Sequence, residues 1–124
     1  MRDKRIYLDP IHGGIVLNRA KDEERLLIEL IDTPEFQRLR HIKQLGLAFF
    51  TFHGAEGSRF THSLGVLHIT RQLLNHLQES CPRVNFHRAV VLCAALLHDL
   101  GHGPLSHTTE DITGLIANTY TVTV

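Results

Sequence analysis

The sequence predicts a small, mainly α-helical domain that begins with a short β-hairpin. Leucines recur at helical spacing between residues 60 and 77, and an unbroken apolar run covers residues 89–97. Near the N-terminus, the β-prone stretches "RIYL" and "GIVLN" flank "DPIHG", whose proline and glycine are typical of a turn. A chain of 124 residues is long enough to bury one helical core.

Two helices are expected directly after the hairpin. A helical pattern covers Asp22–Ile31, and Thr33 followed by Pro34 is typical of a cap and first position of a new helix. This second helix is expected over residues 34–45. Its apolar positions, which we expect to pack on one side, are Phe36, Leu39 and Ile42. Its basic positions, which we expect to form a solvated face, are Arg38, Arg40, His41 and Lys43.

A glycine-containing loop separates these helices from the rest of the chain. It is followed by a helix expected over residues 60–77, which carries Leu64, Leu67, Leu74 and Leu77 at helical spacing. After the turn "SCPRVN" comes the apolar helix, which two glycines and Pro104 end within "LLHDLGHGPLSH".

Charge and composition exclude several classes of function. Lys and Arg number 13, Asp and Glu number 13, and the formal net charge is zero, so no long-range field favours nucleic acid or an anionic membrane. Cys81 and Cys93 indicate reduced thiols of an intracellular protein, cytoplasmic or nuclear, and the longest apolar run is too short to span a bilayer. The ten histidines, in contrast, suggest metal, phosphate or proton chemistry.

The order of the helices predicts that His62 lies beside His98 and Asp99. Two helices joined by a short turn usually pack antiparallel, so the start of the first meets the end of the second. A carboxylate and two imidazoles are costly to bury unless they share a cation or a tight hydrogen-bond network. They suit a hydrolytic divalent metal with one or two further ligands. The alternatives are a packed or surface His62 and a His98 favoured by the helix dipole.

Four ordered stretches carry a resemblance to a known family. They are "DPIHGGI", "IDTPEFQRLRHIKQLG", "RFTHSLGV" and "LLHDLGHGPLSH". Over about residues 4–110 the chain resembles the HD-domain phosphohydrolases, and within them most closely the deoxynucleoside triphosphate triphosphohydrolases, including the vertebrate type that combines SAM and HD domains. The resemblance implies an all-α HD-domain fold. It also implies a reaction that splits a deoxynucleoside triphosphate into deoxynucleoside and inorganic triphosphate.

The resemblance assigns a metal site and substrate contacts. His62, His98 and Asp99 match the family's metal ligands, which commonly bind Mn, Fe, Mg or Zn. Arg59 matches a phosphate-binding arginine, and Gln44 matches a glutamine that lies against the sugar. A metal and an arginine fork would both neutralise charge on the phosphoryl oxygens during attack at phosphorus.

Two later histidines complete the implied pocket. His107 matches a catalytic histidine near the scissile phosphate, and His102 matches a neighbouring histidine. A histidine such as His107 could give a proton to the departing ribose oxygen as a general acid. The alternative is that both histidines cap or stabilise the loop.

The resemblance also implies regulation. In the vertebrate-type enzymes the matching segment contributes to a guanine nucleotide site, and Asp32, Gln37 and Arg40 stand at the matching positions. Because that site is completed across a subunit interface, a guanine nucleotide effector implies a homo-oligomer. The alternative is a helix start followed by a solvated basic face.

The end of the chain departs from the family. Residues 1–110 are expected to be the N-terminal part of an HD domain and residues 111–124 a divergent tail, and the family's fourth metal ligand, a later aspartate, has no match. The alternative functions are therefore a non-catalytic nucleotide-binding or subunit-interaction module, or another HD phosphohydrolase, such as a nucleotidase or cyclic dinucleotide phosphodiesterase. We also expect exposed apolar faces around Leu67, Leu74 and Val91, and hence weak folding or self-association.

Overall fold

The computed structural model describes residues 3–105 and Gly114. His107 and the boundary expected at residue 110 lie outside this part of the chain. The strands are β1 (Lys4–Asp9) and β2 (Gly13–Asn18). The α-helices are α1 (Asp22–Ile31), α2 (Pro34–Gln37), α3 (Arg59–Ser80) and α4 (Arg88–Leu97), and the 3₁₀ helices are η1 (Arg38–His41), η2 (Gly46–Phe50) and η3 (Pro82–His87). The expected helical fold with an N-terminal hairpin is confirmed.

The hairpin is closed by its own turn residues. β1 and β2 pair antiparallel, with Asp9 opposite Gly13 at the turn. The Asp9 carboxylate accepts hydrogen bonds from the backbone N–H groups of Ile11 (2.9 Å) and His12 (2.8 Å), the local bonding that favours Asp in turns. Gly13 has a φ of +71°, which glycine adopts without steric cost. The turn therefore holds His12 at the edge of the helical core.

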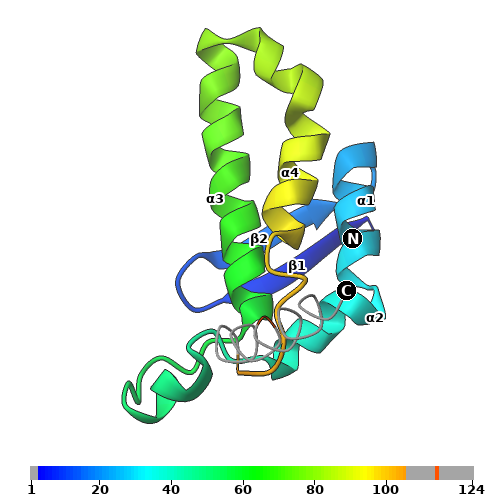
Figure 1. Cartoon of the computed structure of the whole chain (residues 1–124). Coiled ribbons are helices and arrows are strands. Elements are labelled where there is room, and N and C mark those ends of the chain that lie inside the picture. The colour runs from blue at the N-terminus through cyan, green and yellow to red at the C-terminus, as the bar shows by residue number, and fades with distance from the viewer. Residues whose placement is uncertain (1–2, 106–113, 115–124) are drawn as a thin grey trace, which may run out of the picture.

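α3 and the shorter α4 pack side by side as an antiparallel pair (Figure 1). The Ser58 side chain accepts a hydrogen bond from the Thr61 N–H and so caps the first turn of α3. The two helices bury leucines in one core cluster: Leu64, Leu67, Leu74, Leu92 and Leu96. Burial of this apolar surface is the main stabilisation of the pair. The packing brings the start of α3 to the end of α4, as the helix order predicts.

The single helix expected over residues 34–45 is wrong. Only α2 is α-helical, η1 is a 3₁₀ turn, and Ile42 is already extended, with φ −106° and ψ 114°. The chain turns away because its backbone pairs with the segment that precedes α3. Gln44 N–H donates to the Gly57 carbonyl (3.0 Å) and Arg59 N–H donates to the Ile42 carbonyl (2.9 Å). These long-range bonds outweigh the local helical preference.

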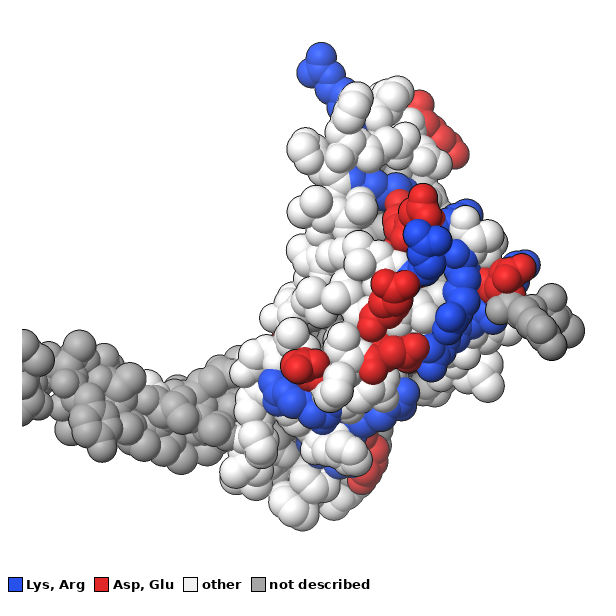
Figure 2. Space-filling view, turned by 90° about the vertical axis from the view of Figure 1, so that its right-hand side faces the viewer, with Lys and Arg blue, Asp and Glu red and all other residues white. Residues whose placement is uncertain are grey.

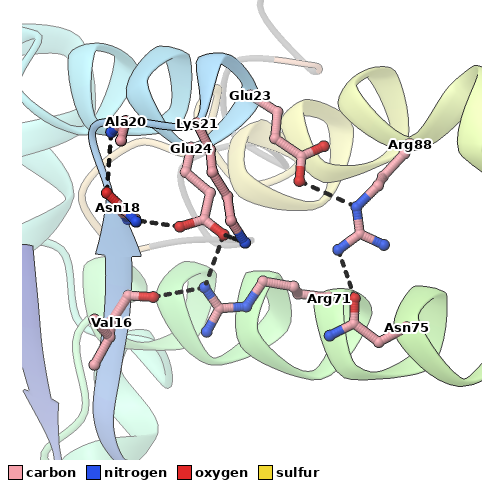
Figure 3. A network of polar contacts seen from close by, with 9 residues as sticks. All are labelled: Val16, Asn18, Ala20, Lys21, Glu23, Glu24, Arg71, Asn75 and Arg88. Carbon is pink, nitrogen blue, oxygen red and sulfur yellow. Dashed lines mark hydrogen bonds and ion pairs between the residues drawn. The ribbon is translucent and has the colours of Figure 1, made fainter. Parts of the chain in front are cut away.

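A buried carboxylate joins the hairpin to the helices (Figure 3). Glu24 on α1 is 5% exposed and accepts a hydrogen bond from Asn18 N–H at the end of β2. Arg71 on α3 lies 3.9 Å from the same carboxylate, and Arg88 at the start of α4 donates to Glu23 of α1 (3.1 Å). A buried charge requires such partners, so this network fixes α1 against α3, α4 and β2.

The surface carries acidic and basic side chains in a mixed pattern. Acidic and basic side chains lie next to one another on the face seen in Figure 2, in agreement with the zero net charge. In the part of the chain that the structure describes, no helix is long and apolar enough to cross a membrane.

The expectation of exposed leucines at positions 67 and 74 is wrong. Leu67 and Leu74 are 1% and 5% exposed, because their side of α3 packs into the core cluster. The exposed apolar side of α3 carries Ile69, Leu73 and Leu77 instead. Val91 on α4 is 38% exposed, as expected.

Candidate metal centre

The packing of α3 against α4 brings together the three predicted metal ligands. His62 lies in the first turn of α3, His98 directly follows α4, and Asp99 is the next residue. One ligand atom of each lies within 4.8 Å of the other two. Among the described residues this is the one cluster of three or more histidine, cysteine or acidic side chains close enough to hold a metal ion. The juxtaposition of the three residues is confirmed.

The hydrogen bonding of His98 leaves its Nε2 atom, which faces His62, available to bind a metal ion. His98 Nδ1 lies 2.8 Å from the Ala95 carbonyl oxygen. Because a carbonyl only accepts hydrogen bonds, Nδ1 carries the proton and Nε2 keeps its lone pair when the imidazole is neutral. That Nε2 lies 3.3 Å from Nε2 of His62. Two nitrogens bound at about 2.1 Å to one ion, at tetrahedral or octahedral angles, lie about 3.0–3.4 Å apart, so this spacing fits a shared metal.

The surroundings of His62 favour its neutral form. Burial lowers the pKa of His62 below its ordinary value, and Asp99 opposes this shift, while His98 and Arg59 add to it. A metal ligand must be the neutral imidazole, since the protonated ring has no lone pair to donate. The environment of His62 therefore suits a ligand near neutral pH.

Asp99 is the buried acceptor at the middle of the site. Its side chain is 9% exposed, and Oδ2 accepts a hydrogen bond from Nη1 of Arg59 (2.6 Å), whose side chain is 3% exposed. The other oxygen, Oδ1, lies 3.3 Å from Nε2 of His98 and 3.4 Å from Nε2 of His102. Arg59 and His102, which the resemblance assigns to the pocket, thus both lie at the carboxylate of Asp99, next to His98.

A hollow of about 460 Å³ opens beside His62, a size typical of small-molecule sites. Its lining includes Gln44 and Thr61 together with the apolar Val66 and Ile69. Oε1 of Gln44 is buried and has no hydrogen-bond partner among the described residues. A buried acceptor without a partner is costly, so this atom is available to a ligand that donates an O–H or N–H group.

Sequence reasoning did not predict that His12 would line this hollow. This residue lies in the hairpin turn and lines the same hollow. It approaches α3 at Gly65, where an added Cβ would lie 3.2 Å from Nε2 of His12. The available signal was the glycine itself, because glycine inside a helix is unfavourable and often marks a close approach.

Of the candidate regulatory residues, Asp32 and Arg40 are exposed and Gln37 is half-buried, and each contacts a neighbouring side chain. Asp32 forms an ion pair with Arg5 of β1. Gln37 accepts a hydrogen bond from Nε of Arg40 (2.7 Å), and the Arg40 guanidinium stacks 3.6 Å above the Phe60 ring. Arg40 is thus more than a solvated charge, because it also packs on an aromatic ring.

Residues 59–122 match the HD-domain family, and they contain the whole cluster of His62, His98 and Asp99. The chain belongs to the HD-domain family. Its sequence is 45% identical over 113 residues to the uncharacterized protein YwfO of Bacillus subtilis, a match that covers 90% of this chain and 25% of YwfO.

Two vertebrate proteins of the same name are similar to this HD-domain chain. It is 46% identical over 106 residues to the deoxynucleoside triphosphate triphosphohydrolase SAMHD1 of Gallus gallus, and 48% identical over 106 residues to that of Homo sapiens. Each match covers 83% of this chain and 16% of the relative. The chain therefore spans a quarter or less of the length of these three relatives.

Proposed function

We propose that this HD domain hydrolyses deoxynucleoside triphosphates to deoxynucleoside and inorganic triphosphate in a metal-dependent reaction. The observation that carries the proposal is the convergence of His62, His98 and Asp99 beside the hollow lined by Gln44. The substrate class comes from the SAMHD1 relatives, whose name states this activity.

His62, His98 and Asp99 would hold the divalent metal, whether Mn, Fe, Mg or Zn, with further ligands from outside this cluster. When bound, such an ion polarises a phosphoryl oxygen and lowers the pKa of a coordinated water. Two imidazole nitrogens and one carboxylate oxygen are a donor set suited to these ions.

The remaining residues would bind and orient the nucleotide. Arg59 keeps a guanidinium at the Asp99 carboxylate, where it would contribute positive charge next to a bound phosphate. The unpartnered oxygen of Gln44 would accept a hydrogen bond from the sugar. His107 is proposed as the general acid for the ribose oxygen, and His102, 3.4 Å from Asp99, as its neighbour in the pocket.

Product analysis tests this function. The purified chain is incubated with each deoxynucleoside triphosphate and Mn²⁺, beside His62→Ala, Asp99→Asn and the exposed control His76→Ala. We expect inorganic triphosphate from the chain and the control, and none from the other two variants. Orthophosphate or pyrophosphate as the first product would contradict the proposal in favour of another HD phosphohydrolase. Nucleotide binding without turnover would contradict it in favour of a non-catalytic binding module.

We also propose a guanine nucleotide effector site at Asp32, Gln37 and Arg40 that is completed between copies of the chain. Asp32 has 42% of its side chain exposed, and a carboxylate can accept two N–H groups from a guanine edge. Arg40 borders a second hollow of about 370 Å³, where its guanidinium could meet a phosphate. Sedimentation should show a larger assembly with GTP, and Asp32→Ala should abolish the change. An unchanged mass with GTP contradicts this second proposal.

A further inference from the structure

Arg38 donates hydrogen bonds to the turn that contains Asp99 and His102. Its guanidinium donates from Nη1 to the His102 carbonyl (2.8 Å) and from Nη2 to the Leu100 carbonyl. Arg38 lies in η1, and the two carbonyls lie 64 and 62 residues further along the chain. The sequence-based assignment of Arg38 to a solvated basic face is therefore incomplete, since its charged group is committed to a distant backbone.

The turn that Arg38 contacts begins where α4 ends. Leu100 N–H donates to the Leu97 carbonyl (3.0 Å) and His102 N–H donates to the Asp99 carbonyl (3.2 Å). The carbonyls of Leu100 and His102 accept the hydrogen bonds of the arginine fork.

A second contact, between Gly46 and Leu105, lies just beyond this turn. Gly46, at the start of η2, has a φ of +54°, and an added Cβ would lie 2.8 Å from the Leu105 carbonyl oxygen. Backbone therefore meets backbone there, at a distance that only glycine permits. The region from Arg38 to Gly46 is thus in contact with both ends of the stretch from Leu100 to Leu105.

We propose that Arg38 is a positioning residue for the metal centre. By clamping both carbonyls it fixes the turn in which Asp99 lies 3.8 Å from His62 and His102 lies 3.4 Å from Asp99. The two nitrogens of the fork are rigidly spaced, so arginine can serve two carbonyls at once, while the single nitrogen of lysine cannot match that spacing. The inference rests on the proposed metal centre for its effect on metal affinity, and on the observed contacts alone for its effect on the turn.

Hydrogen exchange and metal affinity of the full chain test the proposal together. The variants are Arg38→Ala, Arg38→Lys and the control Arg25→Ala, which removes an exposed arginine from α1. In the metal-free chain, Arg38→Ala should speed amide exchange at Leu100 and His102 by about tenfold, with α1 unchanged. The Mn²⁺ dissociation constant should rise about tenfold, as for loss of other groups that orient metal ligands. Arg38→Lys should recover only part of either loss.

Three results would overturn the proposal. The first is wild-type exchange at Leu100 and His102 in Arg38→Ala. The second is an equal acceleration in α1, which would indicate general loss of stability. The third is full recovery by Arg38→Lys, which would assign the effect to charge and not to the fork. Absence of metal binding or turnover in the unmodified chain would count against the proposed function instead, and the exchange measurement would still decide the role of Arg38.

Discussion

His62 and His98 face each other with their Nε2 atoms 3.3 Å apart, although 36 residues separate them in the chain. The contact exists because α3 and α4 pack antiparallel, with one histidine in the first turn and the other at the C-terminal end. This packing explains why the apolar helix α4 is followed by the polar residues His98 and Asp99. The buried Asp99 carboxylate accepts a hydrogen bond from Arg59 at one oxygen, and Nε2 of His98 lies 3.3 Å from the other.

The ion pair of Arg59 and Asp99 should show strong energetic coupling. Both side chains are buried, so Asp99→Leu alone leaves an uncompensated guanidinium and should lower the free energy of unfolding by about 3 kcal/mol. The double variant Arg59→Met, Asp99→Leu should recover most of this loss, because a buried pair can be replaced by apolar side chains. The double-mutant cycle is completed by urea denaturation of the unmodified chain, the single variants Arg59→Met and Asp99→Leu, and the double variant. Additive losses in the double variant would show that the pair is not coupled.

Gly65 should report the approach of the hairpin turn to α3. Replacing a helical glycine with alanine normally stabilises by about 1 kcal/mol. Here the new Cβ would lie 3.2 Å from Nε2 of His12, so Gly65→Ala should gain clearly less. In a His12→Ala background the full gain should return. Equal gains in both backgrounds, measured by thermal unfolding, would show that His12 does not restrict this position.

Stability should fall in acid partly through His68. Burial is the main cause that lowers the pKa of His68 below its ordinary value of 6.5, and Arg71 and His12 add to the shift, while Asp9 opposes it. The unfolded state then binds the proton more readily, so the stabilisation is fully present above about pH 6.5 and is lost as the pH falls towards the lower folded-state value.

The matched variants for this prediction are His68→Gln and, as a control, the exposed His76→Gln. Unfolding free energies between about pH 7.5 and pH 5 should fall less steeply in His68→Gln than in the unmodified chain and the control. The same slope in all three chains would assign the acid sensitivity to other groups.

The exposed apolar stripe on α3 should promote self-association. Leu73 is 54% exposed and lies between Ile69 and Leu77 on the same side of the helix. Leu73→Lys should lower the weight-average mass at high protein concentration, because it places a charge in the stripe. Gln78→Lys, which adds the same charge at an exposed polar position, should leave the mass unchanged. A monodisperse monomer before any substitution would contradict the prediction.

Much of the fold follows from local patterns in the sequence. The hairpin follows from turn residues such as Asp9 and Gly13, and the bounds of α1 follow from apolar spacing and the Thr33–Pro34 boundary. The closeness of His62 to His98 needed one further rule, the antiparallel packing of sequential helices. These features depend on short-range preferences, which the sequence displays directly.

The features that escaped prediction depend on contacts far apart in the chain. Ile42 leaves the helix because its carbonyl pairs with Arg59, and nothing in the residues around it signals that bond. Arg38 resembles any surface arginine until the turn at Leu100 and His102 is placed next to it. Both depend on tertiary structure, which overrides local propensity and charge pattern.

Native mass spectrometry of the chain loaded with Mn²⁺ or Zn²⁺ tests the central claim most directly, since it counts the ions held by each folded chain. We predict one divalent ion in the unmodified chain and in the control His76→Ala, and none in His62→Ala or His98→Ala at the same metal concentration. The same ion count in His98→Ala as in the unmodified chain would contradict the account, because the two histidines that meet at 3.3 Å would then not be metal ligands.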